Sequence, residues 1–309
     1  MEKEDIVRKL LSRGVMVSPD ILEKIKDGGV DAFLEKTDTG ACAVVGAGAK
    51  EGERLSCTIG APGERGEMTP EDAAGANAEK YERIRKMLLR KVDAVSINNL
   101  GRSSSKVCVI GMVKDKVNGG FVIEDGTGEI EVRNSESVDL DDVIGIRGWL
   151  RDRTFFAEEI LLPDIPMSRE PGSMDNTILL SCGAAVHPGK ADVILTPCTI
   201  QENGKEKNLP NPAWIFLDKG KKKITVLVYK TDGKGRKEEA LQWLKKRYVG
   251  KDSPPIAKKE RVLEPIPDIF WIVSDNEPWT ENYKGVSLVS FGEGHSARVD
   301  LKKRKIEVS

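Results

Sequence analysis

The polar loop Ser274-Asp275-Asn276 directly follows the apolar run from Ile269 to Val273. Loops that follow buried strands are a common place for catalytic and binding residues. A carboxylate and an amide oxygen are also ligands that hard divalent cations accept. The chain has only two histidines, His187 and His295, which are most simply a loop residue and a turn residue. This small set of groups does not by itself make a two-metal site.

Two other features of the sequence bear on chemistry. The run GAGAKEG from Gly46 departs by one residue from G-x-G-x-x-G and lacks a preceding strand and a following helix, so a glycine-rich linker is favoured over a dinucleotide site. The cysteines are odd in number and form no C-x-x-C pair, which indicates free thiols in a reducing compartment and neither a disulfide framework nor a zinc site. They are Cys42, Cys57, Cys108, Cys182 and Cys198.

Positive charge is concentrated in one stretch of an otherwise balanced chain. The whole sequence has 49 Lys and Arg against 50 Asp and Glu, but residues 219–261 have 15 against 5. Such a stretch could neutralise phosphates, and the alternative is a solvated face of loops. The candidate DNA contacts in it are Lys221, Lys222, Lys223, Lys245, Lys246 and Arg247.

The N-terminal part of the sequence predicts helices joined by a linker. A length of 309 residues suggests roughly two or three domains. Apolar residues at helical spacing predict a small helical module over residues 1–37. Residues 38–78 are rich in Gly and Ala and lose periodicity, which predicts a flexible linker. A basic amphipathic pattern predicts a connecting helix over residues 79–94.

The rest of the chain predicts a β-barrel and then a mixed domain, so the expected fold class is multidomain α+β. Residues 95–165 contain five short alternating strands, a pattern typical of an OB-fold. Their few aromatic residues and many acids favour a structural role over single-strand binding; those aromatics are Phe121, Trp149, Phe155 and Phe156. Residues 174–309 mix apolar strands with one helix, which predicts a layered α/β domain.

The location expected from the sequence is the cytoplasm. No apolar run reaches the length of about 18 residues that a membrane span needs. The charged start MEKEDIVRK is unlike a signal peptide. We therefore expect a soluble protein with no membrane partner.

The order of these segments resembles the small subunit of archaeal family-D DNA polymerase and, more distantly, the B-subunits of the eukaryotic replicative polymerases. VCVIGMVKDK, EDGTGEIEV, DDVIGIRG and AEEILLPDIP are similar to the OB-fold of that family. NPAWIFLD, ITVLVYK, EALQWLKKRYV, PPIAKKERVLEPIPDIF and YKGVSLVSFG follow the order of its calcineurin-like phosphoesterase domain, which looks shortened here. The resemblance implies a role in archaeal DNA replication beside the large catalytic subunit.

The same resemblance implies that the phosphoesterase metal site is lost. Active members of the family hold two metals with D-x-H, G-D, G-N-H-D and G-H-x-H motifs, and two metals together stabilise a phosphoryl displacement. No G-D or N-H-D occurs in this chain. By the resemblance, residues that cannot replace the ligands stand at the degenerate positions Cys182, His187, Lys230, Trp271, Ser274 and Asn276.

Three functions follow as hypotheses. The favoured one is a non-catalytic accessory subunit that binds the large catalytic subunit and, as a further expectation, DNA, with no cofactor of its own. Its partner-contact candidates are Phe270, Trp271, Trp279 and Tyr283. The first alternative is a surviving Mn²⁺-dependent 3′–5′ exonuclease, and the second is a stand-alone OB-fold protein that binds single-stranded DNA.

Overall fold

The computed structural model divides into two compact units. Met1–Arg65, Met167–Lys237 and Pro265–Ser309 form one, called here the sandwich unit, and Gly66–Pro166 and Glu238–Glu264 form the other, the barrel unit. The structure describes residues 16–17, 44–45, 56–60, 70–101, 106–134, 136, 138–182, 191, 193–195, 200–202, 205–207, 211–231, 235–250 and 261–309. No helix in this described part is long and apolar enough to cross a membrane.

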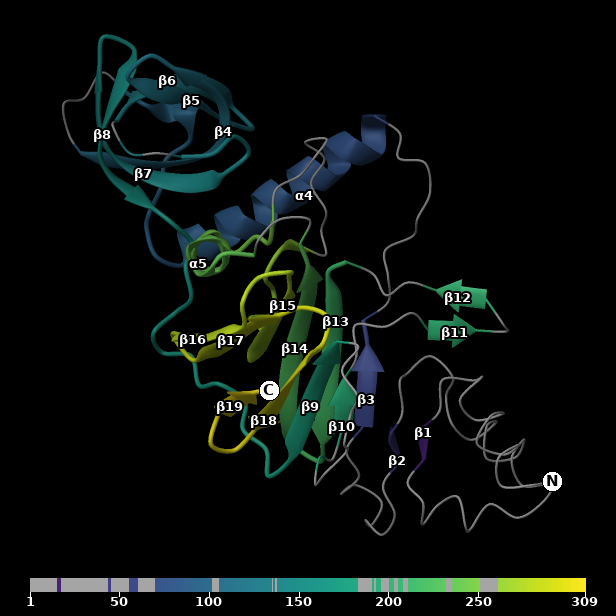
Figure 1. The fold of residues 1–309 in the computed structure, drawn as a ribbon. Coiled ribbons are helices and arrows are strands. Elements are labelled where there is room, and N and C mark those ends of the chain that lie inside the picture. The colour runs from purple at the N-terminus through teal and green to yellow at the C-terminus, as the bar shows by residue number, and fades with distance from the viewer. Residues whose placement is uncertain are drawn as a thin grey trace. The chain divides into compact units, whose positions relative to one another are not determined.

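Five strands of the barrel unit close into a barrel (Figure 1). They are β4 (Val107–Val117), β5 (Gly120–Asp125), β6 (Gly128–Arg133), β7 (Val143–Arg151) and β8 (Thr154–Leu161). Their order is β4-β5-β6-β8-β7, and β6 pairs with β8 in parallel while the other pairs are antiparallel. A closed five-stranded Greek-key barrel of this kind is an OB-fold. The predicted OB-fold is therefore confirmed.

Successive side chains in a strand point to opposite faces. In each strand of the barrel, the apolar residues on one face therefore fill the interior. Val109, Phe121, Ile123, Val132 and Phe155 are at most 1% exposed and belong to one core cluster. Phe121 and Phe155, two of the four aromatic residues considered above for single-strand binding, thus lie inside the barrel. Glycine is required at position 148, because a Cβ there would lie 2.0 Å from the carbonyl oxygen of Phe156.

Helix α4 (Pro70–Leu89) packs against the barrel. Ile84, Met87 and Leu88 share a buried cluster with Ile110 of β4 and Val143 of β7. The helix begins at Pro70, before the predicted start of the connecting helix at residue 79, because proline is well tolerated at a first helical position. A short 3-10 helix, η1 (Ile97–Asn99), then leads toward β4.

The second segment of the barrel unit begins in α5 (Lys237–Lys246), whose first residue belongs to the sandwich unit. Ala240 and Leu244 are buried on this amphipathic helix. The helix expected from EEALQWLKKRYV is therefore present. It is followed by a bridge between Tyr248 and Val262.

The sandwich unit contains a mixed six-stranded sheet. Its order is β16 (Trp279–Tyr283), β17 (Val286–Phe291), β15 (Ile269–Val273), β14 (Lys222–Lys230), β13 (Ala213–Lys219) and β3 (Ser56–Ile59). Strands β14, β15 and β17 run parallel to one another, and the other pairs are antiparallel. Strand β3 comes from the predicted linker over residues 38–78, so that segment contributes a strand to the sheet.

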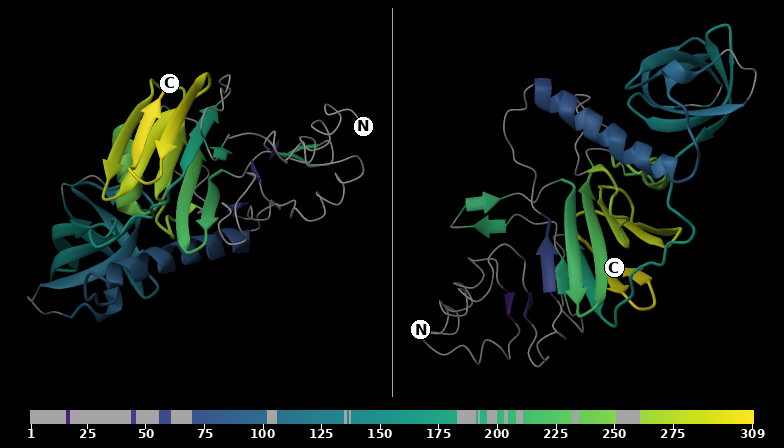
Figure 2. Two further views of the ribbon diagram at one scale, coloured as in Figure 1. Left: turned by 90° about the horizontal axis from the view of Figure 1, so that it is seen from below. Right: turned by 180° about the vertical axis from the view of Figure 1, so that it is seen from behind.

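A second sheet of four strands covers one face of the first (Figure 2). Its order is β10 (Val193–Leu195), β9 (Thr177–Cys182), β18 (His295–Asp300) and β19 (Lys305–Val308). Apolar residues of both sheets, such as Leu180, Val226, Trp271 and Val299, share one buried cluster. The sequence predicted a layered α/β domain. In the described residues of this unit, both layers are β-sheets, and they pack face to face.

Four short strands complete the described chain: β1 (Met16–Val17) and β2 (Val44–Val45), and β11 (Ile200–Glu202) and β12 (Lys205–Lys207). Apart from the two-residue strand β1, the helical module predicted over residues 1–37 lies outside the described residues. His187, Cys42 and Cys198 also lie outside them.

Candidate functional site

The carboxyl ends of three parallel strands form the first candidate site. Lys230 of β14 is in register with Val273 of β15, which is in register with Phe291 of β17. The backbone N–H of Thr231 donates to Val273 at 3.2 Å, and that of Ser274 donates to Phe291 at 3.4 Å. Sheets that contain parallel strands commonly bind ligands at this edge. The structure thus places two of the degenerate positions, Lys230 and Ser274, at this edge, whereas Trp271 lies two residues before the end of β15.

Ser274 is buried, and its hydroxyl is already used. Its Oγ lies 2.9 Å from Oγ of Ser290 on β17, and the two hydroxyls share a hydrogen bond. A nucleophilic serine needs an adjacent base, whereas this hydroxyl faces another hydroxyl. Among the described residues, no group of three His, Cys, Asp or Glu is placed to hold a metal ion.

Backbone fills the space beside Ser274. A Cβ added to Gly292 would lie 2.3 Å from the carbonyl oxygen of Ser274. A Cβ added to Gly235, whose φ is +48°, would lie 2.9 Å from Cβ of Ser274. Two metal ions in a binuclear site stand about 3.5–4 Å apart and need several ligands. The described residues around Ser274 supply no such set of ligands.

Cys182 and His295 are paired on neighbouring strands of the second sheet. They are register partners in β9 and β18, and the N–H of Gly294 donates to the carbonyl of Cys182 at 2.8 Å. Cys182 is half-buried, is not part of a disulfide and packs against the sandwich core. His295 begins a strand rather than occupying the predicted turn, and its Nδ1 lies 3.2 Å from the carbonyl oxygen of Glu293.

The four partner-contact candidates divide by burial. Phe270 and Trp271 are fully buried, and the Trp271 ring packs on Phe291 with centroids 5.0 Å apart. Trp279 and Tyr283 are half-buried on β16, at the edge of the six-stranded sheet. The indole N–H of Trp279 donates to the carbonyl of Gly235 at 3.3 Å. Asn276, the last degenerate position, is half-buried in the loop after β15.

The six candidate DNA contacts lie in different units. Lys221, Lys222 and Lys223 are exposed at the turn between β13 and β14 of the sandwich unit. Lys245, Lys246 and Arg247 belong to the barrel unit. Nζ of Lys246 lies 2.8 Å from Asp139 and 2.7 Å from Asp142. Burial opposes protonation of Lys246, but these two carboxylates raise its pKa above the ordinary value.

Arg247 and Lys245 of the barrel unit are also partly or fully buried. Arg247 is 5% exposed, and its Nε donates to the carbonyl of Leu263 at 3.0 Å. The carbonyl of Lys245 accepts the N–H of Asp164 at 2.7 Å, and its side chain is half-buried. Of the six candidates, the three at the β13–β14 turn therefore have the most freedom to reach a phosphate.

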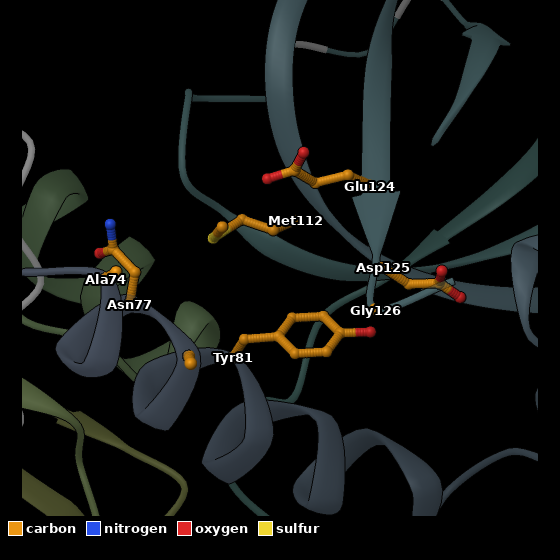
Figure 3. Close-up of a pocket in the computed structure, with 8 residues that line it drawn as sticks. Ala74, Asn77, Tyr81, Met112, Glu124, Asp125 and Gly126 are labelled. Carbon is orange, nitrogen blue, oxygen red and sulfur yellow. The ribbon is translucent and has the colours of Figure 1, made fainter. Parts of the chain in front are cut away.

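A shallow cavity of about 300 Å³ lies between α4 and the barrel (Figure 3). Tyr81 and Asn77 of α4 face Met112, Glu124 and Asp125 of the barrel. Asp125 accepts the N–H groups of Ile97, Thr127 and Gly128, at 2.9, 2.7 and 3.0 Å. Burial alone would raise its pKa, but a hydrogen bond from the Thr127 hydroxyl at 2.6 Å and these N–H groups lower the pKa below the ordinary value. Because Glu124 is paired with Lys114 at 3.2 Å, both carboxylates of the cavity are already engaged.

The outer face of the barrel presents an aromatic pair. Trp149 of β7 and Phe156 of β8 are register partners whose rings stack with centroids 6.4 Å apart and an interplanar angle of 11°. Trp149 is 39% exposed. Arg133 of β6 is in register with Phe156, and Arg151 lies two residues beyond Trp149. The stacking of these two rings could not be read from the sequence, because it depends on strand register.

Sequence reasoning missed the lysines of the β18–β19 turn. Lys302 and Lys222 both contact Asp175, which lies just before β9. Lys303 and Lys305 stand beside Lys302. The run LKKRK from Leu301 was the available signal, but it is about 80 residues away from Lys221–Lys223, so only the fold joins the two groups.

No family model and no curated protein matches the chain. Solved structures that it resembles include the telomere capping protein Ten1 of S. pombe, at 19% identity over 22% of this chain and 79% of that one, with a TM-score of 0.20. The S. pombe Stn1–Ten1 complex is another, at 19% identity over 23% of this chain and 76% of that one, with a TM-score of 0.20. The identification of the barrel as an OB-fold rests on its own strand order.

Proposed function

We propose that the chain is a non-catalytic accessory subunit of an archaeal family-D-type DNA polymerase, which binds the large catalytic subunit. The sequence resemblance supplies the family, and the OB-fold agrees with it. The observation that supports the non-catalytic part is the close packing of Gly292 and Gly235 on Ser274 at the carboxyl ends of β14, β15 and β17.

The loss of ligands has a physical reason in this proposal. A cluster of buried carboxylates without its metal would be mutually repelling charge, at an effective cost of several kcal/mol per ion. By the resemblance Trp271 stands where the family has a metal-ligand histidine, and here it adds apolar volume that is fully buried against Phe291. The sandwich then keeps a stable core while its strand ends contact other proteins.

Trp279 is the residue that we assign to partner contact at this edge. It is half-buried on the edge strand β16, close to Gly235 and the strand-end loops. Half-exposed tryptophans are enriched among the residues that contribute most to protein interfaces. Tyr283 lies at the other end of the same strand.

Co-expression with the large subunit tests the proposal. We expect the two chains to co-elute in size-exclusion chromatography, and Trp279→Ala to weaken the complex by roughly tenfold or more. Thr280→Ala, at the exposed neighbouring position, is the matched control and should leave the complex intact. Elution of the wild-type chain as a separate species would overturn the proposal.

The exonuclease alternative has its own assay. End-labelled single-stranded DNA is incubated with the chain and Mn²⁺, and we expect no shortening of the strand. Because Asp275 is the exposed carboxylate nearest Ser274 in the chain, Asp275→Asn is the informative variant. Hydrolysis by the wild type that this variant abolishes would show a working metal site and contradict the non-catalytic function.

Single-strand binding by the barrel is the second candidate, and the Trp149–Phe156 pair favours it. Aromatic side chains on OB-folds stack on bases, worth about 1–3 kcal/mol per base. Trp149→Ala should then weaken binding of a labelled single strand by roughly tenfold, whereas Leu140→Ala, also exposed on the barrel unit, should not. Equal binding by wild type and Trp149→Ala would remove this candidate.

A further inference from the structure

Two hairpin turns meet at one end of the sandwich. The β13–β14 turn carries Lys221, Lys222 and Lys223, and the β18–β19 turn carries Lys302, Lys303 and Lys305. These six residues are called here the lysine surface. Asp175 joins the turns, because its Oδ2 lies 3.1 Å from Nζ of Lys222 and its Oδ1 lies 2.7 Å from Nζ of Lys302.

The lysine surface is exposed and positively charged. The side chains of Lys222, Lys223, Lys302 and Lys305 are 54%, 79%, 69% and 67% exposed. The carboxylates that pair with them are Asp175, Asp218 and Glu307. Lys221 and Lys303 form no ion pair with any residue in the described part of the chain. Exposed ion pairs are weak, so the paired lysines can also exchange a carboxylate for a phosphate.

Hydrogen bonds order the backbone of the β18–β19 turn. Asp300 accepts the N–H groups of Lys302 and Lys303, at 2.9 and 2.8 Å. Hydrogen bonds from Lys302 and Lys222 lower the pKa of Asp175 to about 2, as expected for a carboxylate that contacts both turns. A turn whose backbone is already ordered loses little backbone entropy on binding.

We infer that the lysine surface binds the phosphate backbone of duplex nucleic acid. Its charge is complementary to phosphate, and lysine contacts to phosphates supply the sequence-independent part of DNA binding. No residue of KGKKK (219–223) or LKKRK (301–305) is aromatic. Recognition of single strands usually adds stacking on aromatic side chains, which these turns do not offer. A duplex needs only the phosphate contacts.

The lysine surface and the strand-end site lie at opposite ends of β14. This strand runs for nine residues from Lys222 to Lys230, and at about 3.3 Å per residue its ends are roughly 26 Å apart. That separation exceeds the screening length of about 8–10 Å at physiological salt. The duplex contact is therefore independent of the degenerate phosphoesterase site, and it does not rest on the polymerase assignment.

Fluorescence polarisation with a labelled 30-base-pair DNA duplex tests the inference, at several salt concentrations between 50 and 200 mM. The variant is the full chain with Lys221→Gln, Lys223→Gln and Lys303→Gln together. Each lost phosphate contact lowers the slope of log affinity against log salt by about 0.9. We expect the slope to fall by about 2–3 and affinity at 50 mM salt to fall at least tenfold.

Matched variants separate charge from structure. Lys221→Arg, Lys223→Arg and Lys303→Arg together keep the charge and should retain affinity. Lys106→Gln and Lys116→Gln, at exposed positions of the barrel unit, should change the slope less than the triple glutamine variant does. An unchanged slope in the triple glutamine variant, or equal loss in the arginine variant, would overturn the inference. A loss confined to a 30-nucleotide single strand would also overturn it.

Discussion

Asp268 is a buried carboxylate that holds three segments of the sandwich unit. Its oxygens accept the N–H of Gly172 at 2.7 Å, the N–H of Thr225 at 2.9 Å and Nη2 of Arg169 at 2.6 Å. The guanidinium of Arg304 also lies 3.8 Å away. Removing one partner of a buried ion pair is strongly destabilising, because it leaves the other charge uncompensated.

We therefore expect Asp268→Ala to lower the free energy of unfolding by about 3–5 kcal/mol. Urea unfolding followed by tryptophan fluorescence measures this change. Glu307→Gln breaks the exposed pair with Lys305 and should leave the urea midpoint close to that of the wild type, since exposed pairs contribute little. Equal midpoints for Asp268→Ala and the wild type would show that the network does not stabilise the sandwich.

At the residue scale, the sequence shows which chemical groups are available better than it shows where their side chains lie in the fold. The sequence resemblance predicts Trp271 and Ser274 as degenerate positions, because neither residue type matches the metal ligands that the resemblance implies there. It could not show that Gly235 and Gly292 close the space beside Ser274. Nor could it separate buried Arg247 from exposed Lys223, because burial of a long charged side chain depends on partners distant in sequence.

At the scale of elements, two adjacent leucines of α4 differ in burial. Leu88 is fully buried between the helix and the barrel, while Leu89 is 38% exposed. Leu88→Ala should cost about 2–5 kcal/mol of stability through lost burial and a cavity. Leu89→Ala should change stability by no more than about 0.5 kcal/mol. Urea unfolding of the two variants compares them, and equal effects would contradict the packing of α4 on β4 and β7.

Tyr81 makes the packing of α4 sensitive to alkaline pH. Its hydroxyl donates to the carbonyl of Ile110 at 3.2 Å, and burial, followed by the charge of Asp125, raises its pKa from 10.0 to about 12. The folded barrel unit keeps the proton that the unfolded chain loses near pH 10. This contribution to stability is therefore complete below pH 10 and is lost as pH rises toward 12.

Comparison with Tyr81→Phe isolates that titration. The wild type should lose stability more steeply than Tyr81→Phe between pH 10 and 12, although lysines titrate in both proteins. Urea midpoints at several pH values in this range supply the measurement. Parallel pH profiles would mean that the Tyr81 hydroxyl has the same pKa in the folded and unfolded states.

The strands of both units were largely predictable, because alternating or continuous apolar runs bounded by glycine mark them in the sequence. Strand β3 was missed, since SCTI is a four-residue segment in a Gly- and Ala-rich region and gains its strand conformation by pairing with β13. Strands β16, β18 and β19 were also missed, because they are largely polar and are specified by their neighbours.

At the scale of the whole molecule, the two ends of the sandwich carry different surfaces. Trp279 stands near the carboxyl ends of the parallel strands, and the lysine surface stands where β14 begins. Each end can therefore be changed without the other. Trp279→Ala should weaken binding of the large subunit and leave duplex affinity unchanged, and the triple glutamine variant of the lysine surface should do the reverse.

The metal dependence of DNA binding distinguishes the lysine surface from a surviving nuclease site. Lysine–phosphate contacts need no divalent cation, whereas a binuclear phosphoesterase site would hold DNA through its metals. We expect the affinity for the 30-base-pair duplex to stay within about twofold when EDTA replaces Mn²⁺ at constant ionic strength. Polarisation titrations in the two buffers measure it. Binding that requires Mn²⁺ and survives the triple glutamine change would place the DNA contact at the strand ends instead, because only a metal-dependent contact there would be insensitive to the lysines.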